Sequence, residues 1–209
     1  MINSKIDYKY YLKVDEIALK KNRGTISYYI SYFLDDIWKF ERLLRKVEYY
    51  KNCKKNILYA PYKLYLDFKF RKLSTKLGFV IPPNVFGPGL SIAHKGTLIV
   101  NVNAKVGANC RIHNCVHIAT NVFNREDELK PDFVMPTPKI GNNVFIGPGA
   151  QIFGNIEIAD DIAIGANSVV NKSFKEKGIT IAGVPARKVS EKGFEKCYHK
   201  STEILNSKR

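Results

Sequence analysis

Residues 140–169 read IGNNVF-IGPGAQ-IFGNIE-IADDIA-IGANSV, five consecutive hexapeptides that each begin with isoleucine. The second position of the hexapeptide is usually Gly or Ala, and the fifth holds Val, Ala, Ile or Ser, all of modest size. Three more hexapeptides, VGANCR-IHNCVH-IATNVF, occupy residues 106–123, and a looser version can be followed upstream from residue 86. A period of six matches neither an α-helix nor an ordinary half-buried strand.

The period of six predicts a parallel β-helix, in which three hexapeptides make one triangular coil of about 18 residues. The aliphatic first residue points inward and stacks on its equivalent one coil away, so several coils are needed for stability. Gly and Asn at the turns tolerate the positive φ of tight corners. We therefore expect residues 79–189 to form one β-helical domain, which makes the fold class mainly β.

Residues 1–78 have a different character, because they are rich in Tyr, Lys, Leu and Phe and contain a single proline, Pro61. Apolar residues near helical spacing predict helices over 27–51 and 62–77, and Pro61 suits the start of the second. The first ~20 residues are expected to add a short helix. The expected apolar stripes are Tyr29, Phe33, Ile37, Phe40, Leu44 and Val47 in one helix, and Leu64, Phe68, Leu73 and Leu77 in the other.

Two segments fall outside the repeat. Ile118 and Ile140 are 22 residues apart, which is not a multiple of six, so a loop over 121–138 must leave the β-helix and return. Loops on rigid scaffolds often carry function, and a surface insertion without function is the alternative interpretation. Residues 190–209 are polar and are expected to form a helical or frayed tail.

The composition excludes several protein classes. Cys53, Cys110, Cys115 and Cys197 are scattered without a CxxC pair, which argues against zinc ribbons and disulfide frameworks and favours a reducing, cytoplasmic compartment. No run approaches the ~18 apolar residues of a membrane span, and the first residues lack the apolar core of a secretory signal.

The chain is basic, with a formal net charge of +15. Residues 1–78 hold 18 Lys and Arg against 8 Asp and Glu, a balance of +10. A basic face attracts nucleic acid, anionic lipid or a phosphate-bearing ligand. No nucleic-acid-binding motif accompanies the charge, so we expect no nucleic-acid partner. A solvated helical surface is the simplest interpretation, and peripheral contact with an anionic membrane is the alternative.

Three stretches carry a resemblance to a known family: GPGLSIAHKGTLIVN (87–101), the repeat region 138–174, and AGVPARKV (182–189). They resemble the hexapeptide-repeat acyltransferases of the left-handed β-helix type, in the serine acetyltransferase branch and the related O-acetyltransferases of surface-polysaccharide synthesis. The resemblance covers about half the chain. It implies a left-handed parallel β-helix with an N-terminal helical region, acetyl-CoA-dependent transfer to a hydroxyl, and a homotrimer that can build larger assemblies.

In this family the cofactor lies in a groove between neighbouring β-helices. A thin pantetheine arm needs backbone free of bulky side chains, and the 3′-phosphate of the nucleotide attracts Arg or Lys. Turn geometry alone is the alternative explanation for the glycines. The positions that match the family's cofactor contacts are Ala119, Thr120, Gly147, Pro148, Gly165, Ala166, Gly183, Ala186, Arg187 and Lys188.

Histidine is the expected general base, because the pKa of an alcohol lies far above 7 and that of histidine lies near neutrality. His94, in SIAHKG, matches the family's catalytic histidine and is the principal candidate. His117 is a second candidate that would orient the acceptor or contact the cofactor. His113 is expected to be an ordinary surface residue, and His199 to be solvated in the tail.

Two positions depart from the serine acetyltransferase pattern. The acidic residue that precedes the family's catalytic histidine is replaced by Ala93, and the second histidine before Pro-Lys-Ile is replaced by Thr137. The groups that would grip the charges of a free amino acid are thus partly missing. We therefore expect a sugar hydroxyl of a surface polysaccharide or its precursor as acceptor in preference to serine, with the 121–138 loop shaping the acceptor site.

Three alternatives stay open. One is a serine O-acetyltransferase of cysteine biosynthesis. Another is a zinc lyase on the same scaffold, as in γ-type carbonic anhydrases, which would need His94, His113 and His117 to converge. Their spacing puts His113 and His117 at different corners, so no metal is expected. The third is a β-helix scaffold without catalytic activity.

Overall fold

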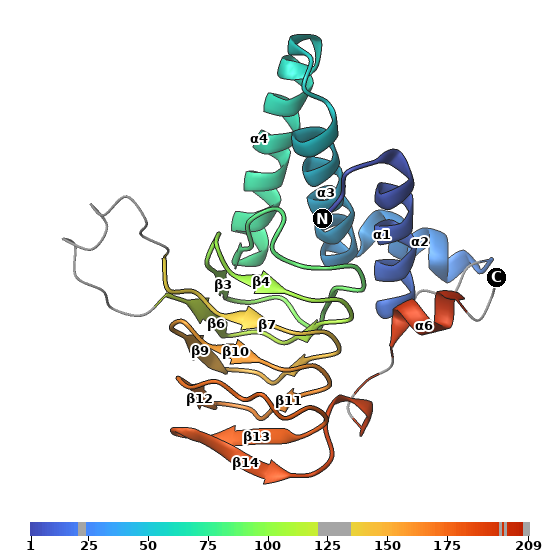
Figure 1. Ribbon diagram of the computed structural model, residues 1–209. Coiled ribbons are helices and arrows are strands. Elements are labelled where there is room, and N and C mark those ends of the chain that lie inside the picture. The colour runs from blue at the N-terminus through green and yellow to red at the C-terminus, as the bar shows by residue number, and fades with distance from the viewer. Residues whose placement is uncertain (21–23, 121–134, 197, 199, 207–209) are drawn as a thin grey trace.

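The computed structural model describes residues 1–20, 24–120, 135–196, 198 and 200–206. A group of helices sits at one end of a triangular β-helix (Figure 1). These helices are α1 (Lys5–Ala18), α2 (Ile26–Leu34), α3 (Asp36–Cys53) and α4 (Ala60–Leu77), with a 3₁₀ turn at Ile57–Tyr59. In Figure 1, α3 and α4 lie side by side and point away from the β-helix. None of the described helices has an apolar run long enough to cross a bilayer.

The helix predicted over 27–51 is two helices. The chain breaks at Asp35, whose ψ of 106° is extended and whose side chain accepts hydrogen bonds from the N–H groups of Ile37 and Trp38. This carboxylate caps α3, so the break is a normal helix start. The apolar stripes are also only partly buried: Phe40, Leu44, Val47 and Leu77 are in the core, whereas Tyr29, Phe33, Leu64 and Phe68 are exposed.

The β-helix has three faces of parallel strands, called here the β3, β4 and β2 faces, and only the last strand of the β2 face, β14, pairs antiparallel. The β3 face orders β1 (Phe79–Val80), β3 (Leu98–Val100), β6 (Val116–Ala119), β9 (Gln151–Phe153) and β12 (Val169–Val170). The β4 face contains β4 (Lys105–Val106), β7 (Lys139–Ile140) and β10 (Glu157–Ile158). The β2 face contains β2 (Ser91–Ile92), β5 (Arg111–Ile112), β8 (Phe145–Ile146), β11 (Ala163–Ile164), β13 (Thr180–Gly183) and β14 (Ala186–Ser190).

The first position of each described hexapeptide faces the interior, as the repeat predicts. Ile112, Ile146 and Ile164 are aligned by the register of consecutive coils, and each is fully buried. The fifth position is buried as well, for example at Cys110 and Ala150. The parallel β-helix with an N-terminal helical region, expected from the sequence, is confirmed.

The fourth position of the hexapeptide makes the corner. Asn109, Asn143 and Asp161 occupy it with φ between 55 and 61°, the left-handed region that Asn and Asp tolerate. Their side chains form a ladder between coils, with Asn109 Nδ2 2.8 Å from Asn143 Oδ1 and Asn143 Nδ2 2.9 Å from Asp161 Oδ1. The ladder satisfies polar groups that a corner would otherwise expose.

A buried ion-pair network joins the helices to the first coil. The Arg45 side chain is fully buried, and its guanidinium lies 2.7 Å from the Asp15 carboxylate and 3.0 Å from the Glu48 carboxylate. It also donates hydrogen bonds to the carbonyl oxygens of Phe86 and Gly87, at 2.9 and 2.6 Å. These carbonyls belong to the first coil, which has no preceding coil to pair with.

The carboxylates of the same network accept backbone N–H groups of the first coil. Burial raises the pKa of Asp15 despite its contact with Arg45, and burial followed by the charge of Asp15 raises the pKa of Glu41 well above its usual range. One Glu41 oxygen accepts the Ile92 N–H, and the other has no partner among the described residues. The N–H groups accepted are Gly89 and Leu90 by Asp15, Ile92 by Glu41 and Asn84 by Glu48.

The C-terminal segment returns along the β2 face to the helices. α6 (Ser201–Asn206) packs against α1, and Thr202 exchanges hydrogen bonds with Asn109 (Figure 1). The Tyr198 ring lies 4.7 Å from the guanidinium of Arg111. This part of the polar tail is therefore docked. His199, Cys197 and residues 121–134 of the expected loop lie outside the described residues.

Candidate active site

His94 lies in the turn that carries the chain from β2 to β3, at the corner between the β2 and β3 faces. We call this edge the histidine corner. The backbone is held there by a hydrogen bond from the Ala93 N–H to the Ile112 carbonyl, at 2.9 Å. The His94 side chain is exposed, and its ring has no hydrogen-bond partner among the residues that the structure describes. The ring is therefore accessible to a molecule that approaches the corner.

The next residue ties this turn to the helices. Lys95 Nζ lies 2.8 Å from the Asp36 carboxylate in the first turn of α3, and Lys76 Nζ lies 2.9 Å from the same group. The hydrogen bonds from Lys95 and Lys76 lower the pKa of Asp36 to about 2. The contact restricts the turn in which His94 stands.

His113 occupies the same corner one coil below His94. The ring centroids of His94 and His113 are 5.9 Å apart. The ring of Phe145 also packs against His113, with 4.9 Å between their centroids. His113 Nδ1 lies 3.1 Å from the carbonyl oxygen of Ile146, and because a carbonyl only accepts, Nδ1 carries the proton. The Nε2 atom of the neutral ring is then left with a lone pair.

His113 is half-buried, whereas the sequence led us to expect an ordinary surface residue. Burial lowers its pKa, the charges of Arg111 and His94 lower it further, and the hydrogen bond to Ile146 opposes the change. The ring is therefore neutral at pH 7. The signal for this placement was available, since His113 stands one coil after Ala93–His94 in the second position of its hexapeptide.

Below the two histidines the corner becomes nearly free of side chains. Gly147 follows β8 and Gly165 follows β11 at the same corner, where each N–H pairs with a carbonyl of the next coil. A Cβ on Gly147 would lie 2.8 Å from the Ile164 oxygen and the Ala166 nitrogen, so the approach of successive coils requires glycine. Turn geometry alone explains this residue, and the bare backbone is its consequence.

The exposed ridge of the corner is lined by the third positions of the hexapeptides. Pro148, Ala166 and Gly183 follow in consecutive coils, and each is exposed. A strip with short side chains thus runs from the two histidines toward the end of the β-helix. We call it the corner strip, and it comprises Gly147, Pro148, Gly165, Ala166 and Gly183.

The strip ends at the antiparallel hairpin of β13 and β14. Arg187 pairs in register with Ala182 beside Gly183, is exposed, and makes no ion pair with any described residue. Lys188 instead contacts the carboxylates of Glu176 and Glu191, which neutralise it. Ala186 is 1% exposed and belongs to the core. Arg187 is therefore an exposed cation at this end of the strip that is not paired with a described residue.

The other candidate residues lie away from the histidine corner. His117 is half-buried on the outer side of the β3 face, in register with Ile99 and Gln151. Ala119 and Thr120 lie at the far edge of that face, where the Thr120 hydroxyl donates to the Pro136 carbonyl at 3.0 Å. The candidate set is thus divided between two edges of one face.

The Thr137 side chain is nearly buried, and its hydroxyl donates to the Asn103 carbonyl at 3.2 Å, at the edge that also holds Thr120. It offers no charged group there.

Across residues 1–20, 24–120, 135–196, 198 and 200–206, no group of three His, Cys, Asp or Glu side chains could hold a metal ion.

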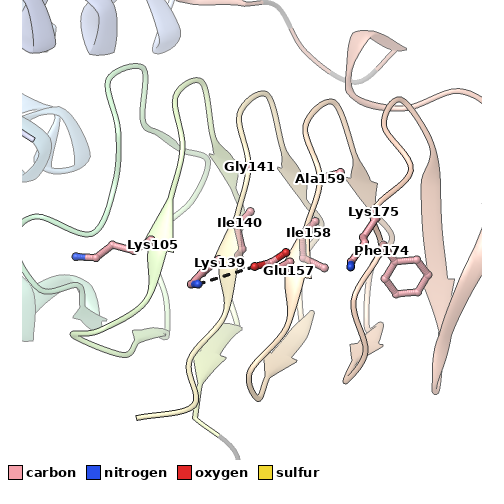
Figure 2. A pocket seen from close by; sticks show the side chains of 9 residues that line it. All are labelled: Lys105, Lys139, Ile140, Gly141, Glu157, Ile158, Ala159, Phe174 and Lys175. Carbon is pink, nitrogen blue, oxygen red and sulfur yellow. Dashed lines mark ion pairs between the residues drawn. The ribbon is translucent and has the colours of Figure 1, made fainter. Parts of the chain in front are cut away.

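A shallow groove on the β4 face is separate from the histidine corner. Figure 2 shows Lys105, Lys139 and Glu157 in a row on successive coils, with Phe174 and Lys175 at the end. Lys139 Nζ lies 3.8 Å from the Glu157 carboxylate, and both side chains are well exposed. Paired, solvated charges of this kind carry no catalytic argument.

Comparisons with known proteins agree with this architecture. Residues 137–172 match the family described as bacterial transferase hexapeptide (six repeats). A serine acetyltransferase of Synechococcus elongatus is 30% identical over 107 residues, which are 51% of this chain and 40% of that protein. One from Staphylococcus aureus is 32% identical over 117 residues, 56% of this chain and 51% of that protein. The chain thus spans about half or less of these relatives.

Solved structures extend the similarity to the helical region. The crystal structure of serine acetyltransferase from Brucella abortus strain S19 superposes with a TM-score of 0.68 and 26% identity, covering 90% of this chain and 71% of that one. The crystal structure of the same enzyme in complex with coenzyme A superposes with a TM-score of 0.68 and 25% identity. It covers 91% of this chain and 70% of that one. The chain is therefore a hexapeptide-repeat protein with a left-handed β-helix, similar in sequence and structure to the serine acetyltransferases.

Proposed function

We propose that the protein is an acetyl-CoA-dependent acyltransferase that acetylates a hydroxyl group at the histidine corner. The observation that carries the proposal is the order of groups along one edge: the exposed His94, a strip of short side chains and Arg187, with neither His94 nor Arg187 paired to a residue that the structure describes. A base, a bare channel and a phosphate-binding cation are the three parts that transfer from acetyl-CoA requires. The relatives named serine acetyltransferase support the same reaction class.

His94 acts as general base in this reaction. Its ring nitrogen takes the proton of the acceptor hydroxyl while the hydroxyl oxygen attacks the thioester carbonyl carbon. The tetrahedral intermediate collapses with cleavage of the carbon–sulfur bond, and the proton on His94 passes to the leaving CoA sulfur. The products are the O-acetyl ester and CoA, so the histidine is returned to its starting state.

His113 positions His94 in place of the acidic residue that Ala93 replaces. Ala93 gives no carboxylate to the turn, and the His113 ring lies beside His94, with 5.9 Å between the two ring centroids. Its neutral ring is fixed by the Ile146 carbonyl, and its Nε2 lone pair favours positive charge on His94. His113 is thus a positioning residue that works through His94.

The corner strip holds acetyl-CoA along its pantetheine arm. Gly147, Pro148, Gly165 and Ala166 offer backbone with little side-chain cover, and Arg187 binds phosphate at the nucleotide end. Ala186 acts only through the core. Lys188 contributes less than Arg187, because its charge is already neutralised by Glu176 and Glu191.

A second copy of the chain completes the site. Ala119 and Thr120 stand at the opposite edge of the β3 face from His94, so one chain cannot bring them to the same thioester. A closed trimer places this edge of one copy against the histidine corner of the next. The trimer thus reunites the two halves of the candidate set.

Serine is the first acceptor to test, because the relatives and the superposed structures carry the name serine acetyltransferase. A sugar hydroxyl is the second. It is favoured by Ala93 and by the buried, uncharged Thr137, which stand where serine acetyltransferases have groups for an amino acid's charges. The sequence led us to expect a sugar in preference to serine. Serine now comes first, and the sugar is retained as the alternative.

The test is release of CoA thiol from acetyl-CoA with serine and a panel of mono- and oligosaccharides side by side. Release with serine supports the first acceptor, and release only with a sugar supports the second. No release with any acceptor, together with no binding of acetyl-CoA, would contradict the proposal.

A further inference from the structure

The tip of the α3–α4 hairpin exposes large apolar side chains. Ile57 and Leu58 in the turn are each 81% exposed, and Leu64 and Phe68 on α4 are 73% and 64% exposed. Tyr65 between them is 48% exposed. The hairpin points away from the β-helix, so no other described element of the chain covers this tip (Figure 1).

These side chains form one stripe. Leu64 and Phe68 are four residues apart and lie on the same side of α4. The opposite side of α4 packs inward through Leu66 and Leu77, so the helix has a satisfied face and an unpartnered one. A patch of several large apolar groups is more than the isolated exposure common on protein surfaces.

Cations surround the stripe. Residues 51–72 contain seven Lys and Arg and one acidic residue, Asp67, a net charge of +6. Asp67 is paired with Lys51 at 3.6 Å, so it does not offset the rest of the group. Exposed cations flanking the stripe are Lys55, Lys69, Arg71 and Lys72.

We propose that the hairpin tip, residues 54–72, docks on the surface of an anionic lipid bilayer. Apolar side chains that enter the boundary between headgroups and acyl chains, with Lys and Arg at headgroup level, are the two components of interfacial binding. The tip offers both on one protruding element. The proposal depends on the hairpin alone and stands whether or not the protein is an acyltransferase.

Charge favours a bilayer over a second copy of the chain. Contact between the tips of two copies, whatever the symmetry, would bring together two copies of residues 54–72, each with a net charge of +5, and like charges that face each other oppose association. An anionic surface instead attracts the cations and leaves the stripe in contact with acyl chains. Phosphate alone would satisfy the cations and leave Ile57, Leu58, Leu64 and Phe68 in water, so nucleic acid fits less well.

Co-sedimentation of the full chain with vesicles tests the proposal. We expect pelleting with vesicles of phosphatidylcholine mixed with phosphatidylglycerol, little with phosphatidylcholine alone, and weaker binding as salt is raised. The double variant Leu64→Glu, Phe68→Glu is expected to lower the partition coefficient by about tenfold or more. Lys69→Glu, Lys72→Glu is expected to lower it mainly at low salt.

The matched control is Ile6→Glu on α1, which is 80% exposed and lies outside the hairpin, and it should bind as the unaltered chain does. Circular dichroism and size-exclusion chromatography establish that each variant is folded. Equal binding by the Leu64→Glu, Phe68→Glu variant, or no binding of the unaltered chain to anionic vesicles, would overturn the proposal. A smaller oligomer of that variant with unchanged vesicle binding would also overturn it and assign the stripe to a second copy.

Discussion

Replacing Arg45 with methionine should destabilise the protein more than any other single charge removal described here. The Arg45 side chain is fully buried, and its guanidinium satisfies the Asp15 and Glu48 carboxylates and the carbonyl oxygens of Phe86 and Gly87. Methionine fills a similar volume without donating to any of them. The substitution therefore tests whether the network that joins the helices to the first coil stabilises the fold.

The magnitude follows from the groups left behind. Breaking a buried ion pair by removing one partner costs about 3–5 kcal/mol, because the other charge stays buried without compensation. For a chain of this size each kcal/mol lowers Tm by about 2–4 °C, so the expected loss is about 6–20 °C. Burial raises the pKa of Asp15 and Arg45 opposes that rise, so without Arg45 the pKa of Asp15 rises above its value in the unaltered protein. The native state then binds a proton that the unfolded state releases, so the loss is larger at pH 8 than at pH 5.

Thermal and urea unfolding at pH 5 and pH 8 measure this effect. Arg71→Met, an exposed arginine on α4 without an ion pair among the described residues, is the control and should change Tm by less than about 2 °C. A loss of less than about 1 kcal/mol for Arg45→Met, or a loss that is greater at pH 5, would refute the reasoning.

Three further predictions concern the network and the site. Glu41→Gln should gain stability relative to the unaltered chain as pH rises above 4.5, because the raised pKa of Glu41 makes the native state bind a proton that the unfolded state releases. Urea midpoints at pH 5 and 8 measure this gain, and the same difference in midpoint at both pH values would contradict it. His113→Phe should lower kcat about tenfold with KM for acetyl-CoA and Tm little changed; steady-state kinetics measure it, and a change in KM alone would assign His113 to binding. Arg187→Ala should weaken CoA binding by about tenfold and Lys188→Ala by less, as measured by calorimetry; equal effects would show that the ion pairs of Lys188 do not matter.

The core of the β-helix could be predicted because its period is written in consecutive residues. Isoleucine at the first hexapeptide position is buried in each coil, because the side chain at this position points into the narrow interior of the prism. The glycines at Gly147 and Gly165 were also found, although the approach of the next coil explains them without a ligand. The SIAHKG motif singled out His94 as the candidate base, and the structure places this residue in the turn between β2 and β3.

The buried network was not predicted from the sequence. Glu41, Arg45 and Glu48 are spaced for one face of a helix, and charged faces are normally solvated. The face is buried because the first coil presents N–H and C=O groups without a preceding coil, and Glu41, Arg45 and Glu48 supply their partners. A pattern within one helix does not contain that information.

The helical region shows the same limit in the opposite direction. Leu64 and Phe68 have the spacing of a core stripe and are exposed, because α4 packs on α3 through its other side. Periodicity predicts that residues share a face and leaves open which face is covered. His113 was similarly assigned to the surface, since its contact with Phe145 and Ile146 comes from the next coil.

The most direct test of the central claim compares the unaltered chain with His94→Ala. Acetyl-CoA binding is measured by calorimetry and CoA release with the acceptor that supports turnover. We predict that the variant binds acetyl-CoA with similar affinity and loses transfer by at least about a hundredfold, since a general base contributes about that much or more. Transfer within about twofold of the unaltered chain would contradict the assignment of the histidine corner as the catalytic site.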